Sequence, residues 1–230
     1  MPTLLTAPTA QAKMTKSAKS GVYLPYILHL APARESGYQT CPKATAGCAA
    51  ACLNTAGRGA FTNVQRARIE KTKLFFEQRA QFLAQLVDEI EKAERKAQKL
   101  GKTLTVRLNG TSDLQWEVYK AFDGKTIFEV FPNVIFYDYT KIANRDVSNI
   151  PNYSLTFSLA ESNATDVSKA IGNGMNVAVV FRDTLPETWQ GMPVIDGDVD
   201  DLRFLDPKFV IVGLRAKGKA KKDTTGFVQD

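Results

Sequence analysis

The chain after Gly101 is a succession of short apolar runs separated by polar or glycine-containing loops. Most of these runs are continuous rather than alternating, which is typical of parallel strands that are covered on both faces. With a similar run at 22–33, they predict about six or seven strands. The runs after Gly101 are TLTVRLNG at 103–110, NVIFYDYT at 133–140, YSLTFSLAE at 153–161, NVAVVFR at 176–182, PVIDGD at 193–198 and FVIVGLRAKG at 209–218.

The region between the first run and the others is helical in pattern. From Thr62 to Leu100 there is neither Gly nor Pro, and apolar residues recur at spacings of three and four, which predicts one long helix or two helices end to end. Residues 116–124 and 163–174 can each hold a short helix. Because the crossovers are short, we expect an α/β fold built as a partial (βα)6-7 barrel of mostly parallel strands, with an N-terminal cysteine loop, rather than a doubly wound sheet.

Length and composition predict one domain. A chain of 230 residues with 44% hydrophobic residues can bury a substantial core, which we place at 21–218. Residues 1–20 predict a flexible N-terminal arm without a secretory signal, and 219–230 predict a basic tail. No apolar run approaches the roughly 18 residues of a membrane span. We therefore expect a cytoplasmic protein with no membrane partner, and the sequence does not indicate its oligomeric state.

The three cysteines are clustered as Cys41-x6-Cys48-x3-Cys52. An odd, local set of cysteines in a chain without a secretory signal argues against a disulfide framework. Cys48 and Cys52 share a face of even one helical turn, and Cys41 can fold back to meet them. Three converging thiolates indicate a metal, either a 4Fe-4S cluster with one open iron or zinc, and reduced cysteines without a metal are the remaining alternative. The single histidine, His29, is the candidate fourth ligand for zinc, but a pocket-lining role is more common for a histidine in an apolar run.

Polar residues follow almost every predicted strand. Strand ends collect functional groups in parallel α/β folds, so we expect these residues to line a pocket beside the cysteine loop. Arg107 is a further candidate because a guanidinium within an apolar strand needs an acidic partner or a bound carboxylate. The strand-end candidates are Asn109, Gly110, Thr111, Ser112, Asp113, Asp138, Lys141, Ser158, Glu161, Asn163, Arg182, Asp196 and Arg215.

A three-cysteine loop after the first strand of a partial βα barrel resembles the radical S-adenosylmethionine enzymes. In this sequence the spacing is Cys-x6-Cys-x3-Cys, whereas that superfamily commonly has Cys-x3-Cys-x2-Cys. The resemblance implies a 4Fe-4S cluster on Cys41, Cys48 and Cys52 and S-adenosylmethionine as cofactor. It also implies a reaction in which reduction of the cluster cleaves the sulfonium to a 5'-deoxyadenosyl radical that abstracts hydrogen from a substrate.

The same resemblance distributes roles among the strand-end residues. The segment LNGTSD stands where the superfamily has a stretch facing the amino group of the cofactor, which implies that Gly110, Thr111, Ser112 and Asp113 line the methionine site. The remaining cofactor-binding candidates are Asn109, Ser158, Asn163, Asp196 and Arg215. The catalytic or substrate-holding candidates are Asp138, Lys141, Glu161 and Arg182.

Across most of the chain the sequence also looks like a phage-encoded family, the gene product 88-like proteins. The resemblance lies in the blocks CPKATAGCAAACLNTAGRG, VRLNGTSD, FYDYTK, SLAESN and VIDGDVDDLRF. It implies a viral origin and a location in the cytoplasm of an infected host. The excess of Lys and Arg over Asp and Glu, 30 to 24, also favours a nucleotide or nucleic acid as partner.

Two other functions compete with the iron-sulfur hypothesis. One is a barrel-type nucleobase transglycosylase acting on DNA, with Asp138 or Asp196 as nucleophile or base at a strand end. The other is a zinc-stapled nucleic-acid-binding module without catalysis, whose binding to any duplex would be sensitive to salt. Metal content separates these alternatives from the first, because neither contains iron.

Overall fold

The computed structural model describes residues 2–10, 12–19 and 21–230. Within these ranges ten strands form one sheet of mixed α/β character, and every run predicted as a strand is confirmed. The sheet consists of β1 (Leu5–Thr6), β2 (Tyr23–Leu28), β3 (Thr103–Arg107), β6 (Ile135–Thr140), β7 (Tyr153–Ser158), β8 (Asn176–Phe181), β9 (Thr188–Trp189), β10 (Met192–Asp196), β11 (Ile211–Arg215) and β12 (Val228–Gln229).

The sheet is mostly parallel, and its order follows the chain from β1 to β8 and then runs backward through β11, β10 and β9. Neighbouring strands run β1-β2-β3-β6-β7-β8-β11-β10-β9, and all pairs from β2 to β10 are parallel. The short strands β1 and β9 pair antiparallel at the two edges. Within the described ranges no pairing is found between these two edges. This order brings the carboxyl ends of the parallel strands to one side of the molecule.

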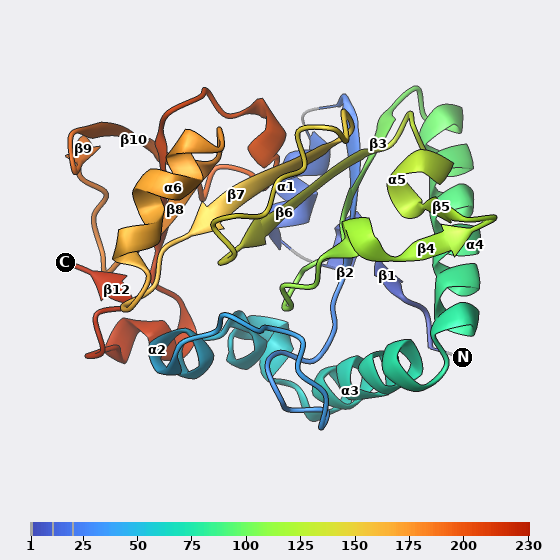
Figure 1. Cartoon of the computed structure of the whole chain (residues 1–230), viewed down its shortest axis with the longest axis horizontal. Coiled ribbons are helices and arrows are strands. Elements are labelled where there is room, and N and C mark those ends of the chain that lie inside the picture. The colour runs from blue at the N-terminus through green and yellow to red at the C-terminus, as the bar shows by residue number, and fades with distance from the viewer. Residues whose placement is uncertain (1, 11, 20) are drawn as a thin grey trace.

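The long helical region forms two helices, which confirms the second of the two predicted alternatives. Helix α3 (Thr62–Glu77) and helix α4 (Arg79–Lys99) are separated at Gln78, whose φ of −137° and ψ of 52° are not helical. Figure 1 shows α3 across the lower end of the sheet, near α2 (Ala46–Ala50), and α4 upright at its side. The other α-helices of the described residues are α1 (Ala12–Lys19), α5 (Ile127–Val130) and α6 (Val167–Gly172).

The prediction of a helix in 116–124 is wrong, whereas the prediction of a helix in 163–174 is confirmed by α6. Residues 116–118 form a single 3-10 turn, and β4 (Lys120–Phe122) then pairs with β5 (Lys125–Thr126) in a hairpin. The Asp-Gly pair between the two strands explains the difference. Asp123 and Gly124 both have positive φ, which is the conformation that a tight hairpin turn requires.

The core lies between the sheet and α4. The stripe predicted for the helix is buried, with Phe82, Leu86 and Ile90 fully enclosed, and α4 packs against β3 and β4. Burial of one such side chain stabilises the fold by roughly 1.5–3 kcal/mol. The opposite end of the domain has a second, smaller apolar cluster. It joins Ala51 of the cysteine loop to Phe227 and Val228 near the C-terminus.

The segment expected to be a flexible arm is packed where the structure describes it, while residues 1, 11 and 20 lie outside the described residues. Leu4 and Met14 are buried, and Leu5 pairs with Leu28 of β2. The carboxylate of Glu89 accepts hydrogen bonds from the backbone N–H groups of Leu4 and Leu5 at 2.8–3.0 Å. These contacts hold the described part of 2–10 as an edge of the domain.

The segment expected to be a basic tail is also built into the domain. Val228 and Gln229 pair in parallel with β8 at its carboxyl end, beyond the residues that pair with β7. Phe227 and Val228 are buried, and these two apolar residues account for the difference. The lysines that suggested a solvated tail lie in a 3-10 helix, Gly218–Lys222, where Lys219, Lys221 and Lys222 are exposed.

Candidate functional site

A cavity of about 1280 Å³ opens at the carboxyl ends of the parallel strands. Its wall takes residues from the ends of successive strands, including His29 after β2, Asn109 after β3, Thr140 in β6, Ser158 in β7 and Arg215 in β11. The cysteine loop and α3 cover the side that the strands leave open. The cavity is therefore bounded by both features from which the sequence predicted a site.

All three cysteines line this cavity, and none forms a disulfide. Cys41 accepts a hydrogen bond from the backbone N–H of Ala33 at 3.4 Å, and its thiol lies 3.7 Å from the carbonyl oxygen of Thr111 in the loop after β3. Cys48 lies in α2, and Cys52 caps the next helical turn by accepting from the N–H of Asn54. The loop thus presents three partly exposed thiols to one space.

Burial opposes ionisation of the Cys41 and Cys52 thiols. It is the main cause that raises the pKa of Cys41 above its ordinary value and that of Cys52 to about 11, and a nearby Cys48 thiolate acts in the same direction. Cys41 and Cys52 are therefore protonated at neutral pH when free, which does not suit a cysteine nucleophile. Within the described ranges no three His, Cys, Asp or Glu side chains are grouped closely enough to hold a metal ion as they stand. The three thiols therefore share a cavity, but in the described residues they do not meet at one point as a metal site.

Glu161 positions the cysteine loop. Its carboxylate accepts hydrogen bonds from the Thr45 hydroxyl at 2.6 Å and the Gly47 N–H at 2.7 Å, and the Thr45 hydroxyl in turn accepts from the Cys48 N–H. Burial acts to raise the pKa of Glu161, but these hydrogen bonds bring it below its ordinary value. A Cβ at Gly47 would stand 2.1 Å from the Thr225 hydroxyl, so this close approach requires glycine. Glu161, a catalytic candidate by sequence, does not line the cavity.

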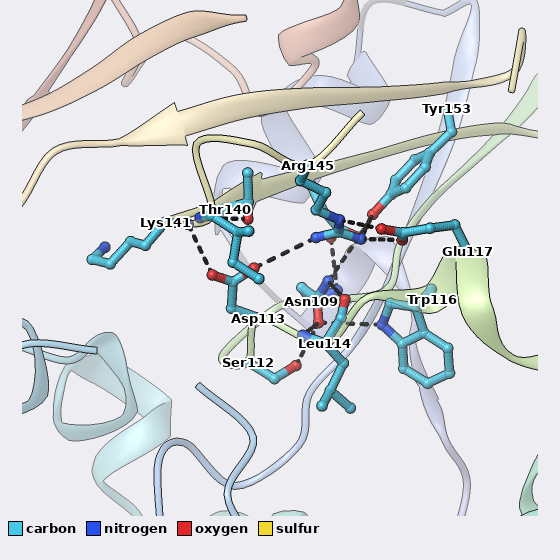
Figure 2. A network of polar contacts seen from close by, with 12 residues as sticks. Asn109, Ser112, Asp113, Leu114, Trp116, Glu117, Thr140, Lys141, Arg145 and Tyr153 are labelled. Carbon is cyan, nitrogen blue, oxygen red and sulfur yellow. Dashed lines mark hydrogen bonds and ion pairs between the residues drawn. The ribbon is translucent and has the colours of Figure 1, made fainter. Parts of the chain in front are cut away.

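The loop after β3 is organised around Asn109. The amide oxygen of Asn109 accepts from the Ser112 hydroxyl, the Leu114 N–H and the Trp116 indole, and its amide nitrogen donates to the Leu114 carbonyl (Figure 2). Gly110 follows, and a Cβ there would stand 2.7 Å from the His29 ring. All five candidates of this loop, 109–113, line the cavity.

Asp138 lies behind that loop rather than in the cavity. It is 1% exposed and accepts three hydrogen bonds, from the Asn109 N–H at 2.7 Å, the Asn109 side-chain amide at 3.2 Å and the Tyr153 hydroxyl at 2.9 Å. Burial raises the pKa of Asp138 to about 7, against the opposing effects of Arg107 and of these donors. Its neighbour Tyr139 points to the other face of the strand and lines the cavity.

A buried arginine completes this network. Arg145 forms two hydrogen bonds with Glu117, at 2.6 and 2.7 Å, donates to the Tyr153 hydroxyl at 2.8 Å and lies 3.5 Å from Asp113 (Figure 2). Asp113 also accepts from the backbone N–H of Lys141 at 2.8 Å. Each group is satisfied by its neighbours, so the network fixes the loop after β3 against β6 and β7.

The remaining candidates divide between the cavity and its surroundings. Lys141 lines the cavity and donates to the Ser158 hydroxyl at 2.8 Å. Asn163, Arg182 and Asp196 do not line it. Asn163 closes its own loop by bonding to Ala160 and Ser158, Arg182 bonds the C-terminal Asp230, and Asp196 pairs with Arg215 at 2.9 Å.

The partner expected for Arg107 is Asp201, which lies in the loop after β10. The two side chains are 3.0 Å apart, and the guanidinium stands 4.7 Å over the ring of Tyr139. Sequence reasoning missed two other cavity residues, Arg68 and Lys71 of α3. Their positions were informative, because they fall on the helix face that also buries Thr72 and Phe75.

Comparison with known proteins identifies the family. No curated protein and no solved structure matches the chain. Within the described residues, no helix combines the length and apolar composition needed to cross a bilayer. The family described as gene product 88 matches residues 3–230, which include the cysteine loop, the loop after β3 and every strand. The chain therefore belongs to the gene product 88 family.

Proposed function

We propose that this protein is an iron-sulfur enzyme of the radical S-adenosylmethionine type. The observation that carries the proposal is that three free cysteines of one loop face a cavity at the carboxyl ends of a parallel sheet. Three thiols are the donor set of a 4Fe-4S cluster with one open iron, and the cavity leaves room for a ligand beside them. We also propose that the sheet curves into a partial barrel, which is the architecture of the radical S-adenosylmethionine enzymes.

Cys41, Cys48 and Cys52 would hold the cluster, which when bound supplies an electron, received from an external reductant, to a sulfonium cofactor. The rest of the chain prepares that space. Glu161 fixes the cysteine loop through Thr45 and Gly47. The absence of a side chain at Gly110 brings the backbone after β3 close to His29.

The loop after β3 is the proposed site for the methionine part of the cofactor. Gly110, Thr111, Ser112 and Asp113 all line the cavity, and the Thr111 carbonyl lies next to Cys41. Asn109, Asp138 and Arg145 would keep this loop rigid, because Asp138 accepts from Asn109 and Arg145 pairs with Asp113 and Glu117. Loop rigidity favours binding of a ligand that needs several groups in fixed positions.

Zinc is the second candidate, because His29 lines the same cavity as the cysteines. Burial lowers the pKa of His29 well below its ordinary value, so the ring is neutral and able to bind a metal. The transglycosylase alternative has less support. Its proposed nucleophiles lie outside the cavity, Asp138 buried among three donors and Asp196 paired with Arg215.

The test is cofactor cleavage. We expect protein purified and reconstituted without oxygen to convert S-adenosylmethionine to 5'-deoxyadenosine when dithionite is added, and Cys48→Ser to lose this activity. Lys43→Gln is the matched control, since Lys43 is exposed in the same loop and does not line the cavity. Cleavage that survives in Cys48→Ser, or its absence from a protein that binds iron and sulfide, contradicts the proposal.

A further inference from the structure

The cavity wall is strongly basic. Seven of its lining residues are Arg or Lys and two are Asp, whereas the whole chain has 30 basic and 24 acidic residues. A concave surface with such an excess of one charge raises the local concentration of oppositely charged ligands. We therefore expect the cavity to attract anions more strongly than the surface as a whole does.

Several of these cations already have acidic partners. Arg107 pairs with Asp201 at 3.0 Å, and Arg215 and Lys217 pair with Asp198 at the rim at 3.6 and 2.5 Å. These pairs neutralise part of the wall, so they do not by themselves require a ligand. The cations of interest are the ones that have no such partner.

Arg68 and Lys71 are two cations of this kind. They are 7% and 8% exposed, and no carboxylate of the described residues lies within ion-pair distance of either. Arg68 donates to the side-chain oxygen of Asn54, and Lys71 donates to the Leu4 carbonyl at 2.8 Å. In both cases an acid is linked to the cation through an intervening residue. Glu35 accepts from the Asn54 amide, and Glu89 accepts from the Leu4 N–H.

Lys141 is a third cation without an ion pair, on the strand side of the same cavity. Its ammonium donates to the Ser158 hydroxyl and lies 5.6 Å from the centre of the Phe227 ring. Buried or half-buried cations of this kind are costly unless an anion compensates them. Arg68 is also near Cys52, whose thiolate would raise its pKa. Lys71 and Lys141 therefore carry the inference independently of the cysteines.

We propose that Arg68, Lys71 and Lys141 make this cavity a binding site for a nucleotide-sized anion, with Arg68 and Lys71, neighbours on one face of α3, as the main contacts of its phosphate group. A phosphate offers up to two negative charges and three strong acceptors, which suits a wall that carries several cations. A cavity of about 1280 Å³ is large enough for a molecule of that size. The inference deepens the proposed function, from which it takes only the assumption that the substrate occupies this cavity.

The experiment is calorimetric titration of the purified chain with AMP, inorganic phosphate and adenosine at constant ionic strength. We expect AMP to bind, inorganic phosphate to compete with it, and adenosine to bind at least about tenfold more weakly. Lys71→Met and Lys141→Met should each weaken AMP binding by about tenfold or more, while Lys71→Arg stays within about threefold. Lys219→Met, which removes the same charge from an exposed residue outside the cavity, is the control.

Two results would overturn the subsite. One is that neither AMP nor phosphate binds at millimolar concentration. The other is that Lys71→Met binds AMP as tightly as the parent protein does. This result would overturn the subsite even if duplex DNA bound the variant and the parent protein equally. Lys71→Arg guards against a folding defect, because it retains the charge. The titration does not need iron, so a protein that binds AMP but no iron contradicts the proposed function alone, and one that binds iron but no anion contradicts the subsite alone.

Discussion

At the scale of single residues, position at a strand end does not determine whether a side chain enters the cavity. Asp138 and Tyr139 are adjacent at the end of β6, yet Tyr139 lines the cavity and Asp138 supports the loop behind it. Side chains alternate between the two faces of a strand, so the orientation of the strand decides which of the two residues faces the cavity. The sequence named the correct strand end but could not supply that register.

Asp138→Asn should destabilise the protein. The three groups around this carboxylate all donate, and an amide would turn a fourth donor toward one of them. We expect a loss of about 1–3 kcal/mol in the free energy of unfolding, measured in urea at pH 8. Asp183→Asn, at an exposed position after β8, is the control. A loss below about 0.5 kcal/mol would mean that the network does not depend on the carboxylate.

The affinity for AMP should fall as the pH rises through about 8. Burial lowers the pKa of Lys71 to about 8, and the facing charges act in both directions, with Glu89 of α4 raising it and Arg68 of α3 lowering it. His29, the titratable group facing Lys71 from the end of β2, is neutral in this range. Deprotonation of Lys71 removes a positive charge from the subsite, whereas a phosphate monoester remains a dianion above its pKa of about 6.

Titration at pH 7 and pH 9 measures this effect. Lys71→Arg should lose less affinity between the two values than the parent protein, because arginine stays protonated. Equal losses in both proteins would show that Lys71 does not carry the pH dependence.

At the scale of elements, the sequence predicted the strands and the main helices well, because their apolar patterns are long and regular. It could not predict the contact between the cysteine loop and Glu161, which joins segments more than a hundred residues apart. Glu161 appeared to be catalytic because it follows a strand. Its hydrogen bonds make it a positioning residue for the helix that contains Cys48.

Glu161→Ala should loosen the cysteine loop. Without the carboxylate, Thr45 and the Gly47 N–H lose their partner, and α2 is too short to be stable alone. We expect the metal-free thiols to react with iodoacetamide at least about threefold faster, because reaction follows local opening of the loop. Ser162→Ala, at the exposed neighbouring position, is the control. Unchanged reaction rates would show that other contacts hold the loop.

At the scale of the whole molecule, both terminal segments belong to the domain. The expected arm and tail were inferred from their Lys, Ala and Thr content, while the few apolar residues among them decide the outcome. Leu4 and Met14 pack at one edge, and Phe227 and Val228 join the cysteine loop at the other. Short apolar segments of this kind have no periodicity, so only their tertiary contacts reveal them.

Phe227→Ala should destabilise the molecule far more than Phe122→Ala. Phe227 is 9% exposed and packs in the cluster beside the cysteine loop, whereas Phe122 is 64% exposed. Removal of a buried phenylalanine costs about 3–5 kcal/mol, which urea unfolding of the two variants would measure. Similar values for the two would mean that the C-terminal segment does not stabilise the fold.

The central claim is that the cysteine loop holds an iron-sulfur cluster, and the measurement that tests it most directly is the iron and sulfide content of the chain purified without oxygen. The claim predicts about four irons and four sulfides per chain, and their loss in Cys41→Ser, Cys48→Ser and Cys52→Ser. Lys43→Gln should retain both. One zinc per chain, or iron that remains after any of the three cysteines is replaced, would contradict the account.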